Sequence, residues 1–140
     1  MLQKETVIQK LNKLKAYLQE LRTYETISWE EYKTTFHHRR TVERLIQLIV
    51  DVAVDINTHT VVDEGQSPPK DAINSFVDAA KLGMMPITFA HQIAPSTGER
   101  NIIIHEYEQI DDAVVYKSII DALQLYDQYI NFIVAYLETK

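Results

Sequence analysis

The sequence contains no cysteine among its 140 residues. This absence excludes disulfides, zinc sites built on thiolates and a cysteine nucleophile, and it is consistent with a reducing compartment. Positive charge is also scarce, because 14 Lys and Arg stand against 20 Asp and Glu, for a net charge of −6. Nucleic acid would therefore have to bind through a local basic patch and not through the overall charge.

Long apolar runs are missing as well. An uninterrupted run such as residues 48–50 is far shorter than the roughly 20 apolar residues of a membrane helix, and the charged N-terminus has no apolar signal segment. We therefore expect a cytoplasmic protein without membrane contact. A content of 46% hydrophobic and 24% charged residues is typical of a globular chain, and we expect one domain over residues 1–140.

Helix breakers are absent from both ends of the chain. All three glycines and all four prolines lie between residues 65 and 98, which favours long helices in the flanks. Three regions have apolar residues at alternating intervals of three and four, the spacing of one buried helix face. The positions are Val7, Leu11, Leu14, Leu18 and Leu21; Val42, Leu45, Ile49, Val52 and Ile56; and Tyr116, Ile119, Leu123, Tyr126, Ile130, Ile133 and Leu137.

Capping patterns predict where helices begin. The spacing Ser-x-x-Glu, in which the two side chains satisfy each other's backbone amides, occurs at residues 28–31 and 96–99. Asp111 or Asp112 can cap the last helix. A break or kink is expected near residues 34–38, between a short helix and a longer one.

Glycine and proline divide the middle of the chain. A Pro-led helix is predicted over residues 71–82, with Gly83 as its stop. A short helix is predicted to start near Pro86 and to end or kink at Pro95. No segment has the alternating pattern of a strand, so we expect an all-α, up-and-down bundle of five or six helices. Apolar surface left on long amphipathic helices would be covered in a homodimer.

A polar stripe follows the second long helix. Its members are spaced by 4, 3, 4 and 4 and share one face, and they are Arg40, Arg44, Gln47, Asp51 and Asp55. A solvated surface is the ordinary explanation of such a stripe. The functional alternative is a basic patch over residues 37–44 that contacts RNA or a protein partner through Arg39, Arg40 and Arg44.

Residues 100–107, RNIIIHEY, place four polar side chains around three isoleucines. In a helix, Arg100 and Tyr107 lie two turns apart on nearly one face. Asn101 and His105 form an i, i+4 pair on an adjoining face. An arginine near a helix N-terminus suits an anion, although a polar fringe on a core helix explains the same spacing.

The isoleucines of this motif have their own expected role. Ile102 and Ile103 face away from the polar residues and are expected to anchor the helix in the core. Arg100 and His105 are about 140° apart on an ideal helix, so a distortion or a cleft shared between two subunits would be needed to bring them together.

Several kinds of site are excluded by pattern. No acidic residue stands three positions before any histidine, and His-Glu-x-x-His is absent, so the di-iron and zinc-hydrolase motifs are missing. The three scattered glycines form no phosphate-binding loop. We therefore expect either a metal-free mechanism or no catalysis, and in both cases no cofactor.

RNIIIHEY resembles the Arg-x4-His-x-Tyr signature of HepT-type toxins, which are all-α ribonucleases of the HEPN superfamily. The resemblance covers most of the chain. Residues 41–61 resemble the second long helix of that family, residues 67–85 its Pro-led central helix, and residues 100–116 its active-site segment. The Arg, Asn, His and Tyr positions of the motif are all kept.

The resemblance implies a metal-independent RNA endonuclease, the homodimeric toxin of a type VII-like toxin–antitoxin pair. Its substrate would be tRNA or mRNA. Arg100 would stabilise charge on the scissile phosphate, and His105 would transfer a proton to or from the 2′-hydroxyl or the leaving oxygen. Asn101 would support them by orienting the phosphate or the histidine.

The resemblance also implies a switch at Tyr107. The cognate antitoxin would be a minimal nucleotidyltransferase that transfers AMP from ATP to this tyrosine, and the added phosphate would block the site. The alternative is a non-catalytic helical module that binds a nucleotidyltransferase or a nucleotide, which the acidic net charge favours.

Overall fold

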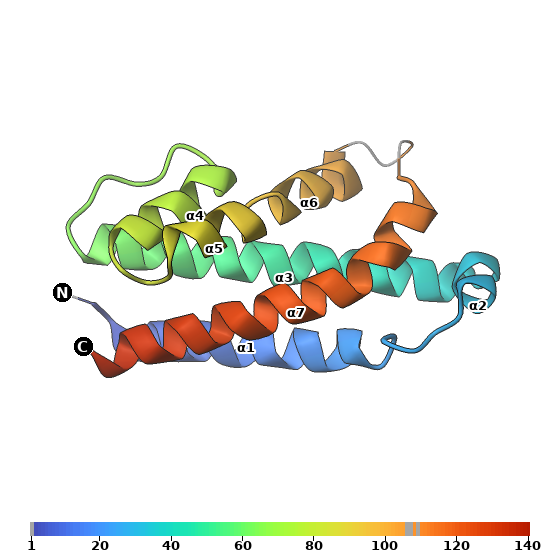
Figure 1. The fold of residues 1–140 in the computed structure, drawn as a ribbon, viewed down its shortest axis with the longest axis horizontal. Coiled ribbons are helices and arrows are strands. Elements are labelled where there is room, and N and C mark those ends of the chain that lie inside the picture. The colour runs from blue at the N-terminus through green and yellow to red at the C-terminus, as the bar shows by residue number, and fades with distance from the viewer. Residues whose placement is uncertain (1, 106–107, 109) are drawn as a thin grey trace.

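The residues that the structure describes, 2–105, 108 and 110–140, form seven α-helices and no strand in this computed structural model (Figure 1). In chain order the helices are α1 (Lys4–Arg22), α2 (Trp29–Thr34), α3 (Phe36–Asp63), α4 (Ala72–Lys81), α5 (Ile87–Ile93), α6 (Ser96–His105) and α7 (Asp112–Glu138). The predicted all-α bundle is confirmed. Seven helices are present among these residues, where five or six were expected.

The helices are arranged around α3, which runs through the centre of the molecule (Figure 1). On one side, α1 and α7 lie along it and contact each other. On the other side, the shorter α4, α5 and α6 follow one another above α3. The end of α6 and the start of α7 lie at the same end of the bundle as α2 and the start of α3 (Figure 1).

The apolar stripes are confirmed by burial. All five predicted positions of α1 are buried, and in α3 and α7 only Val52 and Tyr116 remain half-buried. Two further tyrosines of α7, Tyr129 and Tyr136, enter the core beside the predicted face. Burial of each large apolar side chain contributes about 1.5–3 kcal/mol, so these stripes provide the main force that assembles the bundle.

Most predicted helix ends are confirmed. Ser28 Oγ accepts a hydrogen bond of 3.1 Å from the Glu31 amide at the start of α2, and Asp111 accepts from the amides of residues 113 and 114 at the start of α7. Gly83, with φ +88°, follows α4 in the left-handed conformation that glycine adopts without strain. Thr35 is extended between α2 and α3, at φ −109° and ψ 100°, which is the expected break.

The capping box predicted at residues 96–99 is wrong. Ser96 is already helical, and its hydroxyl donates to the Ile93 carbonyl at 2.7 Å. The Glu99 carboxylate accepts from the Ser118 hydroxyl at 2.6 Å. Both side chains therefore bind other groups, because packing against α7 offers them partners that the local sequence does not show.

α3 is the one helix among the described residues that is long and apolar enough, by length and composition alone, to cross a membrane. Half of its most apolar window is buried inside the protein, and α1, α2, α4, α6 and α7 all pack against it. Apolar residues on several faces are what a helix needs when other helices surround it. α3 is therefore the central helix of the bundle.

A chain of polar groups crosses the core between α7, α3 and α4. The Tyr129 hydroxyl donates to Asn57 Oδ1 at 2.6 Å, and Asn57 Nδ2 donates to Ser75 Oγ at 3.3 Å. The Ser75 hydroxyl donates to the Ala72 carbonyl at 2.7 Å. All three side chains are fully buried, so each one depends on the next to satisfy its hydrogen-bonding capacity.

We expect Tyr129→Phe to lower the free energy of unfolding by about 1–3 kcal/mol, because it leaves a buried Asn57 oxygen without its donor. Urea unfolding followed by circular dichroism measures the change. Tyr17→Phe removes the same atom from a half-buried tyrosine of α1 whose hydroxyl makes no hydrogen bond among the described residues, and it should change stability far less. Equal losses for the two variants would contradict the proposed importance of the chain of polar groups.

Candidate active site

Arg100 is the motif residue that the structure places most clearly. It lies in the second turn of α6, and its Nη1 atom is 2.7 Å from Asp51 Oδ1 on α3. The side chain of Arg100 is only 19% exposed. A charge-assisted hydrogen bond at this distance fixes the direction of a long, flexible side chain, so α3 holds the guanidinium of the motif arginine in place.

The polar stripe of α3 is therefore not simply a solvated surface. α6 packs on it through the Arg100–Asp51 pair, and Lys10 of α1 forms an ion pair with Asp55. Farther towards the start of α3, Arg40 forms two hydrogen bonds with Glu43, at 2.5 and 2.6 Å. Two members of the stripe, Asp51 and Asp55, thus link α3 to neighbouring helices, and Arg40 pairs within α3 itself.

The start of α6 is attached to α7 by two side-chain contacts. Ser96 Oγ and the buried Tyr126 hydroxyl are 2.6 Å apart, and one turn later Glu99 accepts from Ser118. Desolvation raises the pKa of the Tyr126 phenol. Burial likewise raises the pKa of Glu99, although its hydrogen bond from Ser118 opposes the shift. These contacts fix the helix that carries Arg100.

The three isoleucines of the motif divide between core and surface. Ile103 is 8% exposed and belongs to the core, whereas Ile102 is 39% and Ile104 37% exposed. The expectation that both Ile102 and Ile103 anchor the helix is therefore wrong for Ile102. Successive residues turn by about 100°, so an α6 that lies on the surface of α3 buries only the one isoleucine that faces inward.

A hollow of about 390 Å³ separates α6 from the start of α7. Its walls are mainly apolar, and they include the exposed side chains of Ile102 and Val114. Asn101 is exposed on the outer surface of α6. The surface around the motif is therefore open to a ligand or a partner.

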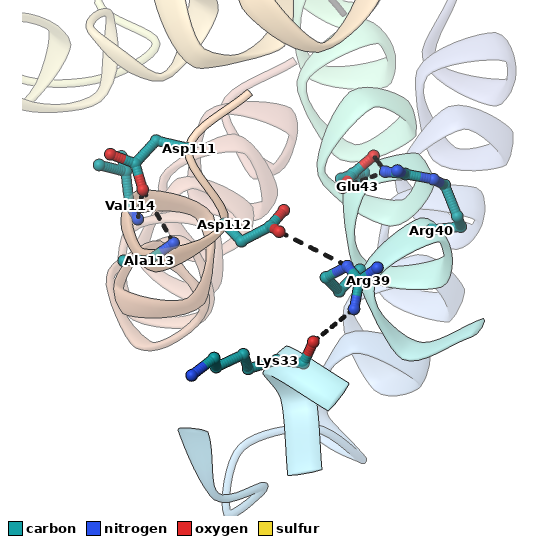
Figure 2. Close-up of polar contacts among 8 residues, drawn as sticks. All are labelled: Lys33, Arg39, Arg40, Glu43, Asp111, Asp112, Ala113 and Val114. Carbon is teal, nitrogen blue, oxygen red and sulfur yellow. Dashed lines mark hydrogen bonds and ion pairs between the residues drawn. The ribbon is translucent and has the colours of Figure 1, made fainter. Parts of the chain in front are cut away.

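Arg39 joins three elements at the end of the bundle, as Figure 2 shows. Its Nη1 donates to the Lys33 carbonyl at the end of α2 at 2.5 Å, and its Nε lies 3.5 Å from Asp112 in the first turn of α7. Asp111, the adjacent residue, caps α7. Arg39 thus holds the beginning of α7, directly after the segment that contains the motif histidine and tyrosine.

Arg40 lies on Phe36 and pairs with a buried carboxylate. Its guanidinium carbon is 4.6 Å from the centre of the exposed Phe36 ring, within the range of a cation–π contact. Glu43, its partner, is only 3% exposed. Desolvation raises the pKa of Glu43, and the hydrogen bonds and charge of Arg40 oppose this rise. Arg40 therefore makes a buried carboxylate tolerable in this position.

The three arginines predicted to contact RNA or a partner thus have different surroundings. Arg39 and Arg40 form ion pairs with acidic residues of the same chain. Arg44 is exposed and makes no ion pair with any residue that the structure describes. The contact with RNA or a partner stays a prediction, and among these three arginines Arg44 is the one whose charge no described residue matches.

The side chain of one site residue and the whole of another fall outside what the structure describes. His105 ends α6, but its side chain is not described, and Tyr107 lies outside the described residues. The predicted divergence of Arg100 and His105 therefore stays a prediction. Among the described residues, no group of three or more acidic residues and histidines could hold a metal ion.

Sequence reasoning missed two partners in this region. The sequence pattern assigned Asp51 to the polar stripe but did not identify it as the partner of Arg100. The two residues are 49 positions apart, and no local sequence pattern relates them. Glu43 was not singled out, although its spacing of three residues from Arg40 is a recognised signal for a helical ion pair. Each carboxylate determines where a candidate arginine points.

The sequence of the chain matches a known protein family. Residues 14–133 match the family described as ribonuclease HepT-like. The chain is 37% identical over 123 residues to the tRNA nuclease HepT of Aphanizomenon flos-aquae, and the match covers 88% of this chain and 84% of the relative.

Solved structures match the fold. One is a tri-AMPylated Shewanella oneidensis HEPN toxin in complex with MNT antitoxin, with a TM-score of 0.83 and 20% identity over 92% of this chain and 96% of that one. Another is the cytosolic protein of unknown function YutE from Bacillus subtilis, with a TM-score of 0.82 and 14% identity over 99% and 92%. At such identities the likeness establishes the fold.

We expect Glu99→Gln to raise stability relative to the parent by an amount that grows with pH. The folded-state pKa of Glu99 lies above its ordinary value, so the parent loses stability as pH rises through that pKa, whereas glutamine stays neutral. The amide oxygen can still accept from Ser118. Urea unfolding at pH 4, 6 and 8 measures the difference, which should be smallest at pH 4.

Glu25→Gln is the matched control, since Glu25 is exposed and has no ion pair among the described residues. Its effect on stability should depend less on pH. A difference between the Glu99 variant and the parent that shrinks with rising pH would overturn the account of this site.

Proposed function

Because this chain belongs to the family of HepT-like ribonucleases, we propose that it is a metal-independent RNA endonuclease, the toxin of a type VII-like toxin–antitoxin pair. The observation that supports this proposal most directly is the guanidinium of Arg100, held by Asp51 at the surface of α6, five residues before His105 in the sequence. A fixed cation and a histidine that converge on one phosphate are the equipment needed to cleave a phosphodiester without a metal.

Arg100 would stabilise negative charge on the scissile phosphate. Asp51 binds one of the five N–H donors of the guanidinium, and the Nε donor is buried and has no partner among the described residues. Because the ion pair has already fixed the side chain, little conformational entropy remains to be lost when the phosphate binds. This prior orientation helps to offset the partial neutralisation of the guanidinium by Asp51.

His105 would transfer the proton. In the simplest metal-free cleavage, the 2′-oxygen attacks phosphorus, the bond from phosphorus to the 5′-oxygen breaks, and a proton passes from the 2′-hydroxyl to the leaving 5′-oxygen. The products are a cyclic 2′,3′-phosphate and a 5′-hydroxyl end. An imidazole suits this transfer because its ordinary pKa lies close to neutrality. Asn101, exposed on α6, would orient the phosphate or the imidazole.

The assembly is proposed from the family and from the open surface. We expect a homodimer, in which a second copy brings Arg100 and His105 of the two chains around one cleft. The relative named a tRNA nuclease favours tRNA over mRNA as the substrate. The similar toxin bound to MNT antitoxin favours a cognate minimal nucleotidyltransferase as the partner, and both would act in the cytoplasm.

Regulation would act through Tyr107. The partner would transfer AMP from ATP to the phenol oxygen with release of pyrophosphate, and the chain itself would need no cofactor. The similar toxin with three AMP units makes this modification a direct expectation for the present chain. Each added phosphodiester carries a negative charge and would repel RNA phosphate from the site.

We expect Arg100→Ala and His105→Ala each to reduce the rate of tRNA cleavage on the order of 100-fold or more, since each removes stabilisation of the transition state. Gel analysis of tRNA incubated with purified protein, with and without EDTA, measures the rate. Arg22→Ala is the matched control, because Arg22 forms a 2.8 Å ion pair with Asp127 between α1 and α7, away from α6.

Equal cleavage by the parent and the Arg100 or His105 variants would refute these catalytic roles. Loss of activity in EDTA that added magnesium restores would refute metal independence. If the parent cleaves no RNA but binds the nucleotidyltransferase tightly, the protein is the non-catalytic binding module that its acidic charge allows.

We expect incubation with the partner nucleotidyltransferase and ATP to add the mass of one or more AMP units and to stop cleavage. Intact-protein and peptide mass spectrometry locate the addition. Tyr107→Phe lacks the acceptor oxygen and should remain unmodified and active, whereas Tyr116→Phe should be modified like the parent. Undiminished labelling of the Tyr107 variant would exclude this tyrosine as the acceptor.

A further inference from the structure

We propose that Arg44 and the groove beside it form a second phosphate subsite for RNA, separate from the scissile phosphate at Arg100. This inference rests on the proposed ribonuclease function and extends it to the binding of the neighbouring nucleotide. The groove, of about 350 Å³, lies between α3 and α6. It is lined by Arg40, Glu43, Arg44, Gln47, Ile103 and Ile104.

The balance of charge around the groove favours an anion. Glu43 is matched by Arg40 at 2.5 Å, and next along α3, Asp51 is matched by Arg100 at 2.7 Å. Arg44 stands between these two pairs and makes no ion pair among the described residues. As far as the described residues go, the unmatched positive charge on this surface therefore belongs to Arg44, in a chain whose overall charge is −6.

The chemistry of the lining suits a nucleotide. A guanidinium can donate two parallel hydrogen bonds to one phosphate. The Gln47 amide offers both a donor and an acceptor to a ribose hydroxyl or a base edge. Ile104, 37% exposed, provides an apolar surface for the sugar or the base. The occupant to which these groups are complementary is one sugar–phosphate unit of RNA.

The position along α3 separates this subsite from the scissile phosphate. Arg44 and Asp51, the residue that holds Arg100, are seven residues apart on one helix, a rise of about 10 Å. Arg44 would thus contact a neighbouring phosphate while Arg100 contacts the one that reacts. The exposed cation of Arg44 and the fixed cation of Arg100 would together align the strand for cleavage, which lowers KM more than it raises kcat.

Arg39 and Arg40 have a different role in this account. Arg39 joins α2, α3 and α7 through the Lys33 carbonyl and Asp112, and Arg40 matches the buried Glu43 within α3 (Figure 2). Removing either arginine would leave a carboxylate without its ion-pair partner, and the resulting loss would be one of stability. Arg44 can be removed without breaking any ion pair among the described residues, so it allows the cleaner test.

The test measures both binding and cleavage of purified bacterial tRNA. Binding is measured over a range of salt concentrations in a His105→Ala background, which is expected to leave tRNA intact. Cleavage kinetics are measured in proteins that keep His105. Arg44→Gln should reduce the slope of log K against log salt concentration by about 0.7–0.9, the loss of one phosphate contact. It should raise KM at least several-fold with kcat little changed, and Arg44→Lys should restore the salt slope.

Lys81→Gln is the matched control, since it makes the same charge change at an exposed lysine of α4 without an ion pair among the described residues. A salt slope and KM unchanged by Arg44→Gln, or changed equally by Lys81→Gln, would overturn the subsite while leaving the ribonuclease intact. So would normal tRNA binding together with lost binding of the nucleotidyltransferase, which would make Arg44 a protein contact. A parent protein that neither binds nor cleaves tRNA would refute the proposed function as well.

Discussion

The constraint on which the structure depends is that α3 must accommodate five other helices. α1, α2, α4, α6 and α7 all pack against it, and only a few of its residues, Arg44 and Asp55 among them, remain exposed. Its apolar stripe fills the core, and its polar stripe has to be compensated by partners on adjoining helices. Asp51 binds Arg100 of α6 and Asp55 binds Lys10 of α1, while Glu43 is matched within α3 by Arg40. The Arg100–Asp51 contact is part of this compensation. This one contact pairs a carboxylate of the central helix and also fixes the cation of the candidate active site.

Helix positions could be predicted because the information is local. The spacing of leucines in α1 needs only the period of the helix, and the extended Thr35 and the left-handed Gly83 follow from patterns a few residues long. The prediction failed at Ser96 and Glu99, whose side chains bind Tyr126 and Ser118 of α7. Capping rules compare a side chain with its own backbone, and they contain no information about a hydroxyl supplied by a distant helix.

The candidate site shows the same division. Family resemblance and spacing identified Arg100, but Asp51, 49 residues earlier, could be recognised as its partner only in three dimensions. The basic cluster at residues 37–44 looked uniform in sequence. In the structure, Arg39 and Arg40 are matched by carboxylates, while Arg44 is not matched among the described residues. Local charge density could not separate these roles, since it counts cations without regard to the acidic residues that the fold brings next to them.

The attachment of α6 to α7 has a consequence for biosynthesis. Ser96 and Glu99 precede their partners Tyr126 and Ser118 in the chain, and the buried Asn57 must likewise wait for the Tyr129 hydroxyl. While the ribosome is still adding α7, the helix that carries Arg100 has no support on that side, and the core is open. For a protein proposed to be toxic, the site of the nascent chain would then lack full support until α7 has emerged. A partner could therefore bind during the time in which the ribosome synthesises α7.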